Sequence, residues 1–438
     1  MDYFTEKYIF DLVNSILLKN HQRYSIKSSI SLLFNSFLLI LLFSTCKKET
    51  DITNTDSTIR YKPYGLTYLH DFVVTKSGDL LLLGESTNQI QLTRAKSSGE
   101  LIWQKNIDLI PEHDVEYNMH NVAENSDQTI LVFGTQSKVK DNNNFAVIKL
   151  SSSGEHLKTK TLFLKPKNTA DVLSYSTNHF GFYTKDREGG YFIQLRLAED
   201  YSYGVGRVDH IVHYNSKDSF DLVIDPTELN PYTNDTQLEL QQNKDNGSLV
   251  LLNIGFDGPV DYFIEKLDNA EFLQGKISKK WSTQLPIIGK WIRGYSDDRS
   301  FYCCNLVAND AENETKGMLI AKLDMNTGAK VKEWLIPFKH EVSDIYALDQ
   351  PWSFTTDENS LYMSVTLENH AYILKTSKDG ADYKLIPIGG NISRDLILKI
   401  GVSGDQILVF GYGSLNRSKE QLLYMCSINK NGEIIDHE

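Results

Sequence analysis

Two pairs of neighbouring side chains have types and spacing that suggest chemistry. The adjacent Cys303 and Cys304 could form a disulfide, and His210 and His213, three residues apart, could share a metal ion. Both pairs lie in segments that read as β-strands. Because successive strand residues point to opposite faces, residues one or three apart face opposite sides. We therefore expect no disulfide between the two cysteines and no metal ion shared by the two histidines. The two thiols are expected to pack as small apolar groups.

Other polar groups give weaker signals. His113, Asp114 and His120 fall in an expected loop and could line a pocket, although polar residues are common on any loop that faces solvent. Asp257 and Asp261 flank a Gly-Pro turn but lack the alternating oxygen ligands of a calcium loop. The sequence contains no GxSxG, HExxH or P-loop pattern. It therefore predicts no catalytic residues, no metal site and no cofactor.

The composition is that of a folded, β-rich and acidic protein. The 438 residues include 23 Tyr and 20 Phe but only 10 Pro, and 41% are hydrophobic. Aromatic residues favour strands, and this apolar content excludes wholesale disorder. The net charge of −12 repels phosphate backbones, so we expect no nucleic-acid partner.

The N-terminus has the pattern of an export signal. Arg23 and Lys27 precede the uncharged segment 28–45, which is rich in Leu, Ile and Phe. A basic flank before an apolar segment is typical of a secretory signal peptide. Eighteen residues are barely enough to span a bilayer, so an uncleaved membrane anchor is the alternative. Both interpretations place the rest of the chain outside the cytoplasm.

The end of this segment, Phe43-Ser44-Thr45-Cys46, resembles the lipobox of bacterial lipoproteins, and the following Lys-Lys-Glu resembles lipoproteins of the Bacteroidota group. Phe43 departs from the commoner Leu. The resemblance implies that Cys46 is lipidated, becomes the new N-terminus and anchors the protein in the outer membrane. We therefore expect a signal peptide over 1–46, a flexible tether over 47–60 and one domain over 61–438.

This domain contains a repeat. Polar turns with glycine recur at Gly99 and Gly154, 55 residues apart, and at Gly328, Gly380 and Gly432, each 52 apart. This period is about the length of a four-stranded propeller blade. We predict an all-β fold, a β-propeller of seven blades, from units at about 64–110, 115–167, 171–228, 235–286, 290–338, 342–388 and 393–438. Paired β-sandwiches or a β-solenoid are the alternatives.

Both ends of the chain are expected to complete the last blade. The final unit ends in a short apolar stretch, Glu433-Ile434-Ile435, which we predict as its outer strand. The segment near Ile59–Tyr64 is predicted to help close the ring. A closed ring leaves no free sheet edge.

The segments 98–105 and 326–334 resemble the repeats of quinoprotein-type and related secreted propellers. This resemblance implies a fold and no particular activity. In quinoprotein dehydrogenases an adjacent Cys pair forms a strained disulfide beside the quinone. The other ligands of that cofactor have no counterpart that we can place here, so a redox enzyme is the last of our hypotheses.

Propellers usually bind through loops at one end of the ring. Tyr117, His120, Trp291 and Trp352 fall in or near such loops and are our candidate ligand-binding residues, with packing between blades as the alternative. The leading hypothesis is a non-enzymatic binding or scaffold module that contacts protein or glycan in the cell envelope. The alternatives are an envelope enzyme acting on glycans, whose acid and base come from different blades, and a scaffold for outer-membrane assembly.

Overall fold

The computed structural model of the chain describes residues 60–61, 63–86, 89–107, 115–138, 144–164, 172–186, 188–201, 204–224, 237–242, 249–255, 261–276, 278–286, 292–297, 299–308, 315–337, 353–367, 370–388, 392–415, 421–433 and 435. All of them belong to one compact unit spanning 55–438. Cys46, the expected signal peptide and nearly all of the tether lie outside the described residues.

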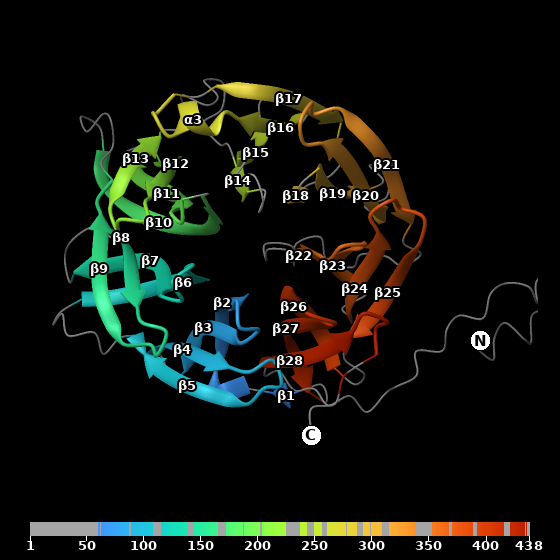
Figure 1. The fold of residues 1–438 in the computed structure, drawn as a ribbon, viewed down its shortest axis with the longest axis horizontal. Helices are drawn as coiled ribbons and strands as arrows, with labels where there is room; N and C mark the ends of the chain where they lie inside the picture. Colours follow the sequence, from blue (N-terminus) through green and yellow to red (C-terminus); the bar gives the residue numbers. More distant parts are fainter. Residues whose placement is uncertain are drawn as a thin grey trace, which may run out of the picture. The chain divides into compact units, whose positions relative to one another are not determined.

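The described strands form seven antiparallel four-stranded sheets arranged radially in a ring (Figure 1). Each sheet is one blade, and its first strand lies on the inner side of the ring. Blade 1 contains β2 (Tyr68–Val74), β3 (Leu80–Ser86), β4 (Gln89–Ala95) and β5 (Leu101–Asn106). Blade 2 contains β6 (Val115–Glu124), β7 (Ile130–Lys138), β8 (Asn144–Leu150) and β9 (His156–Leu162).

The next three blades follow in chain order. Blade 3 contains β10 (Val172–Lys185), β11 (Tyr191–Tyr201), β12 (Gly204–Tyr214) and β13 (Phe220–Ile224). Blade 4 contains β14 (Gln237–Gln242), β15 (Leu249–Gly255), β16 (Asp261–Leu267) and β17 (Lys279–Pro286), with the short helix α3 (Asn269–Phe272) between its last two strands. Blade 5 contains β18 (Ile292–Ser296), β19 (Ser300–Ala308), β20 (Thr315–Asp324) and β21 (Lys330–Pro337).

The last two blades bring the chain back to its start. Blade 6 contains β22 (Phe354–Thr356), β23 (Ser360–Leu367), β24 (His370–Ser377) and β25 (Tyr383–Ile388). Blade 7 contains β26 (Ile392–Ser403), β27 (Gln406–Leu415), β28 (Gln421–Asn429) and, as its outer strand, β1 (Arg60–Tyr61). The one-turn 3-10 helix η1 (Pro63–Gly65) links β1 to blade 1.

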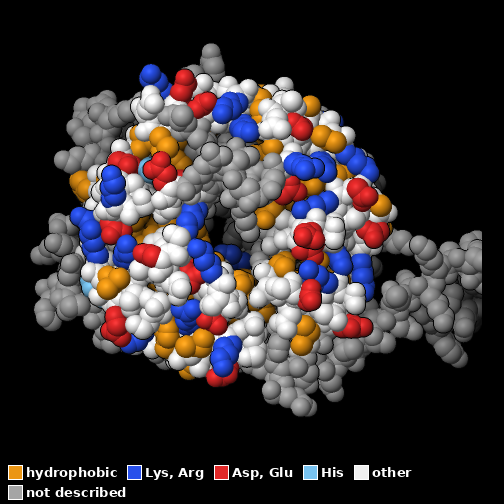
Figure 2. Space-filling model, viewed as in Figure 1, with side chains coloured by type: hydrophobic (Ala, Val, Ile, Leu, Met, Phe, Trp, Pro, Cys, Tyr) orange, Lys and Arg blue, Asp and Glu red, His pale blue; other side chains and the backbone are white. Residues whose placement is uncertain are grey.

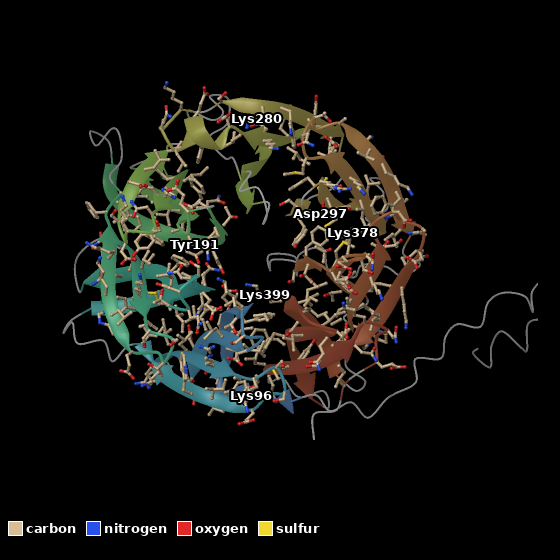
Figure 3. The ribbon with its side chains drawn as sticks, viewed as in Figure 1. Lys96, Tyr191, Lys280, Asp297, Lys378 and Lys399 are labelled. Atoms are coloured by element: carbon tan, nitrogen blue, oxygen red, sulfur yellow. The ribbon has the colours of Figure 1, made fainter. Side chains whose placement is uncertain are left out.

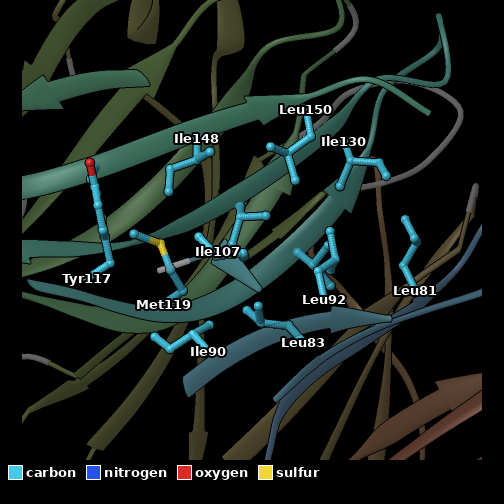
Figure 4. Close-up of a cluster of buried hydrophobic side chains, with 13 residues drawn as sticks. Leu81, Leu83, Ile90, Leu92, Ile107, Tyr117, Met119, Ile130, Ile148 and Leu150 are labelled. Carbon is cyan, nitrogen blue, oxygen red and sulfur yellow. The ribbon is translucent and has the colours of Figure 1, made fainter. Parts of the chain in front are cut away.

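Each blade buries both faces against its neighbours. In β3 the four consecutive leucines are buried; Leu81 and Leu83 face blade 2, and Leu80 and Leu82 face blade 7. Figure 4 shows the first of these interfaces, between blades 1 and 2. The described residues form seven such apolar clusters, one for each pair of adjacent blades. Unbroken apolar runs therefore replace the alternation of a sheet with one wet face.

The repeating glycines have two structural reasons. Gly154, Gly328 and Gly380 all have positive φ, at 80°, 73° and 67°, a conformation that glycine adopts without strain. Each also lies against a tryptophan of the preceding blade: Trp103, Trp281 and Trp334 would be 2.7–3.1 Å from an added Cβ. The Gly period in the sequence therefore follows from the contact between one blade's outer strand and the next blade's turn.

The ring is closed by the start of the chain. Arg60 pairs with Met425, and Tyr61 with Tyr424, on the edge of β28. Further along the same edge the Ile435 amide donates to the Ser427 carbonyl at 2.8 Å. The predicted role of the segment near residue 60 is confirmed, and β1 rather than residues 433–435 is the outer strand of blade 7.

The predicted all-β propeller is therefore confirmed. The first six predicted repeat units each contain one sheet, and the seventh corresponds to three strands of blade 7, whose outer strand is β1. Within the residues that the structure describes, no helix has the length and apolar character needed to cross a bilayer.

Two glycine substitutions separate backbone strain from packing. Gly78 has φ of 84° and nothing within 4 Å of an added Cβ, so Gly78→Ala tests strain alone. We expect it to lower the free energy of unfolding by about 1–2 kcal/mol. Gly328→Ala adds a Cβ 2.7 Å from the Trp281 ring, and we expect a loss of about 2–4 kcal/mol because overpacking adds to the strain. Equilibrium urea unfolding measures both variants, and equal losses would contradict a packing role for Gly328.

Candidate functional site

Three neighbouring inner strands carry a β-bulge at the same position. His70 lies in a bulge between Leu69 and Asp71 of β2, and His120 lies in one between Met119 and Asn121 of β6. Leu398 takes the equivalent place in β26. Bulges re-aim side chains and occur often beside functional sites. The three bulges thus lie at equivalent positions of β2, β6 and β26, the innermost strands of blades 1, 2 and 7 (Figure 1).

Glycines on the second strands make room for these bulges. Gly84 and Gly134 pair with the residues just before His70 and His120. A Cβ on Gly84 would lie 2.2 Å from the Tyr68 carbonyl oxygen, and one on Gly134 would lie 2.2 Å from that of Asn118. Only glycine permits so close an approach of the inner strand.

The bulges bring together five side chains from three blades, which we call the His–Tyr cluster: Tyr68, His70, Glu85, His120 and Tyr412. His70 Nε2 lies 2.9 Å from Glu85 Oε1. The His70 ring centroid lies 5.6 Å from that of His120 and 4.8 Å from that of Tyr68. Tyr412 of blade 7 lies 5.7 Å from Tyr68 between ring centroids, and its hydroxyl accepts a hydrogen bond from the Leu69 amide at 3.2 Å.

Burial keeps the rings of this cluster uncharged at neutral pH. Burial is the main cause that lowers the pKa of His120 to about 4. The nearby His70 ring also lowers this pKa, and the Glu85 carboxylate raises it by a smaller amount. Burial also lowers the pKa of His70, against the opposing effect of Glu85. The pKa values of Tyr68 and Tyr412 are raised, first by burial and for Tyr68 also by Glu85. Both imidazoles are therefore neutral and both phenols protonated at pH 7.

The contact with Glu85 fixes the tautomer of His70. A neutral imidazole that faces a carboxylate through Nε2 carries its proton there, which leaves the lone pair on Nδ1. Tyr68 is 39% exposed, so the cluster is open to a ligand. It offers ring faces, hydroxyl donors and an oriented imidazole that can accept a proton.

A cation lies beside this cluster at the inner side of the ring. Lys399 of β26 forms an ion pair with the buried Asp71, the residue after His70. Figure 3 shows Lys399 at the inner margin of the ring. In the space-filling view the centre of the ring is hollowed, and Lys and Arg side chains border the hollow (Figure 2).

The candidate residues from the sequence fall in different places. Tyr117 and His120 lie in strand β6, which begins at Val115, and not in a loop. Tyr117 is buried in the apolar interface between blades 1 and 2 (Figure 4), whereas the bulge turns His120 into the His–Tyr cluster. Trp291, Trp352 and Cys46 lie outside the described residues.

The cysteine pair is structural. Cys303 packs between blades 4 and 5, and Cys304 packs between blades 5 and 6. Both are free thiols, and burial raises the pKa of Cys303. The expectation that the two thiols face opposite sides is confirmed, and the geometry does not match a disulfide beside a quinone.

His213 is held between two carboxylates. Its Nε2 lies 2.6 Å from Asp186 and its Nδ1 lies 2.6 Å from Asp221. Burial opposes protonation of the ring, but these hydrogen bonds raise the pKa of His213 above its usual value. Both ring nitrogens are thus occupied by carboxylates and neither is free for a metal. No group of three or more His, Cys, Asp or Glu among the described residues is arranged to bind one.

Sequence reasoning missed Tyr68, His70, Glu85 and Tyr412. The signal that could have found the histidines is the glycine that closes an apolar strand, as in Leu-Leu-Leu-Leu-Gly84 and Ile-Leu-Val-Phe-Gly134. His70 and His120 each lie fourteen residues before that glycine.

Comparisons with known proteins agree on the fold. No protein-family model matches the chain, and no curated protein matches it. The polysaccharide lyase Uly1 is similar in structure, with a TM-score of 0.50, 9% identity, and coverage of 87% of this chain and 94% of that one. A catalytically inactive virginiamycin B lyase from Staphylococcus aureus, solved with quinupristin, gives a TM-score of 0.47 and 11% identity, over 84% and 97% of the two chains. At 9% identity the likeness to Uly1 is one of fold alone.

The environment of His120 predicts its titration. We expect its imidazole to stay neutral at pH 6 and to take up a proton with a midpoint near 4, because burial disfavours the charged ring. Since this pKa is below the 6.5 of an unfolded chain, protonation favours unfolding, and stability falls as the pH drops from about 6.5 towards 4. NMR of the imidazole nitrogens measures the midpoint, with His120→Gln to assign the signal. A midpoint at 6 or above would show that the ring is not buried in this way.

Proposed function

We propose that this protein is a binding module of the cell envelope, which takes a glycan or a protein segment at the His–Tyr cluster. The observation that carries the proposal is the meeting of Tyr68, His70, Glu85, His120 and Tyr412 from three blades, in a half-buried cluster that Tyr68 opens to solvent. The apolar faces of the blades explain the closed ring, but they do not require two histidines, two tyrosines and a carboxylate in contact.

The chemistry of the cluster suits a ligand with apolar faces and hydroxyl or amide edges. Tyrosine and imidazole rings offer flat apolar surfaces together with polar tips. Because the rings are neutral at pH 7, contact with a ligand does not require desolvation of a charged imidazole. Sugar rings and peptide segments both have this combination of surfaces.

The place of action in this proposal rests on the N-terminal sequence. The basic flank, the apolar segment 28–45 and Cys46 support export and lipid anchoring. The acidic net charge of −12 supports partners other than nucleic acid. We therefore propose attachment to the outer membrane, with the propeller held by the polar tether.

Binding is tested with the mature protein against neutral and acidic oligosaccharides and envelope-protein peptides. Tyr68→Ala and His70→Ala should each weaken any binding found at least tenfold, about 1.4 kcal/mol, because each removes a ring from the cluster. Tyr383→Ala is the matched control, since Tyr383 is exposed on the outer strand β25, away from the cluster. Isothermal titration calorimetry measures the affinities. An equal loss in the control, or no loss in the two cluster variants, would refute this site.

A second function, an enzyme acting on glycans, is favoured by one specific contact. Glu85 orients His70 through Nε2, which leaves Nδ1 to accept a proton, as in a carboxylate-oriented general base. The cluster contains one carboxylate among its described residues, whereas glycoside hydrolysis commonly uses two. Elimination is therefore the reaction that these residues fit. His70 removes the proton from the carbon next to a uronate carboxyl group, the bond from the neighbouring carbon to the glycosidic oxygen breaks as the double bond forms, and a tyrosine hydroxyl protonates that oxygen.

Elimination creates a carbon–carbon double bond that absorbs in the ultraviolet. If the protein is a lyase, incubation with polyuronates should raise this absorbance, and His70→Gln should reduce the rate by about 100-fold or more, as expected for loss of a general base. His156→Gln, on the exposed outer strand β9, should leave the rate unchanged. A full rate in His70→Gln would exclude this mechanism, and no absorbance change in the wild type would leave binding as the function.

A further inference from the structure

Asp71 is a fully buried carboxylate that joins three blades. Its side chain has no exposed surface. Oδ1 accepts a hydrogen bond from the Phe72 amide at 2.8 Å, and Oδ2 accepts hydrogen bonds from Asn121 Nδ2 at 3.2 Å and the Val122 amide at 3.0 Å. Lys399 of blade 7 completes the set through an ion pair. Donors from blades 1, 2 and 7 thus compensate the buried charge.

These contacts lie directly behind the bulges that build the His–Tyr cluster. Asp71 follows His70, Asn121 follows His120, and Lys399 follows Leu398 at the equivalent bulge. The hydrogen bonds of Asp71 therefore hold the backbone next to His120 against the strand that carries His70. Blade 7, which Lys399 attaches to Asp71, is also the blade that supplies Tyr412 to the cluster.

Another joint in the ring shows that closure alone does not need a carboxylate. Ser353 opposes Ser364 in blade 6 as Asp71 opposes Leu83 in blade 1. Its hydroxyl accepts a hydrogen bond from the Ile400 amide of blade 7 at 2.8 Å, the same contact that Asp71 makes with Val122. A serine thus makes the blade-to-blade hydrogen bond, so the charge of Asp71 and its further contacts call for another explanation.

We propose that Asp71 is the positioning residue of the His–Tyr cluster: it holds His70 and His120, from neighbouring blades, at their observed separation and fixes blade 7 beside them. The importance of this role for ligand binding rests on the proposed function. The positioning itself is a property of the free protein. Two separate measurements can therefore distinguish failure of one from failure of the other.

The test uses Asp71→Ser, which keeps the acceptor for the Val122 amide, as Ser353 does for Ile400, and removes the contacts to Lys399 and Asn121. We expect the NMR midpoint of His120 to rise by at least one pH unit from about 4, because the ring loses its fixed, buried place beside His70. Any oligosaccharide or peptide found to bind the wild type should bind this variant at least tenfold more weakly. Asp71→Asn, of nearly the same size, is the second variant. Loss of the carboxylate and the unpaired Lys399 cation would by themselves lower the midpoint of a nearby histidine, so a rise in either variant reports the lost position of the ring.

Ser353→Ala is the matched control, because it breaks the equivalent joint between blades 6 and 7. We expect it to lower the thermal midpoint while the His120 titration stays as in the wild type. An unchanged His120 midpoint in folded Asp71→Ser and Asp71→Asn would overturn the proposal and make Asp71 a structural joint only. A shifted midpoint in a protein for which no ligand is found would support positioning and count against the proposed binding function. If neither variant folds while Ser353→Ala does, the proposal is also overturned, since Asp71 is then needed for the fold itself.

Discussion

The mutual burial of adjacent sheet faces is the constraint on which the rest of this structure depends. Each blade has two apolar faces and can hide both only between two neighbours, so the sheets must form a closed circle. Leu80 to Leu83 illustrate this, since alternate members of one short run belong to two different interfaces. Strands of adjacent blades are then held side by side, which allows residues distant in the sequence, such as His70 of β2 and Tyr412 of β27, to share one site.

Much of the fold could be predicted because its requirements repeat. The turn glycines recur since each adopts positive φ, and several lie against the outer strand of the blade before, as Gly328 does against Trp281 and Gly432 against Ile386. A local need of this kind leaves a regular mark in the sequence. The opposite facing of Cys303 and Cys304 could be predicted for a similar reason, because strand geometry alone decides it.

The site could not be predicted in the same way. The alternation of strand residues between two faces does not predict where His70 and His120 point, because each is an extra residue that interrupts the pairing of its inner strand. The partners come from separate blades, and no spacing in one chain shows that Tyr412 meets Tyr68. Tyr117 shows the opposite case: an aromatic residue near an expected loop is part of the apolar interface between two blades.

The inner side of the ring combines apolar packing with a small number of buried polar joints. Asp71 and Ser353 occupy equivalent positions, yet one is a charge bound to three blades and the other a hydroxyl bound to one neighbour. Buried charges are stable only when each lone pair has a donor, so the joint at Asp71 tolerates little change in blade spacing. This joint lies directly behind the His–Tyr cluster.

The closing strand has a mechanical consequence. Among the residues that the structure describes, β1 closes the ring through two residue pairs, Arg60 with Met425 and Tyr61 with Tyr424. Under the proposed anchoring at Cys46, the thirteen residues 47–59 reach at most roughly 45 Å from the membrane to this strand. Any drag on the domain, from flow or from a bound partner, would be transmitted to that short ladder. The strand pair that closes the propeller would therefore also carry the load from the tether, and tension would first separate β1 from β28.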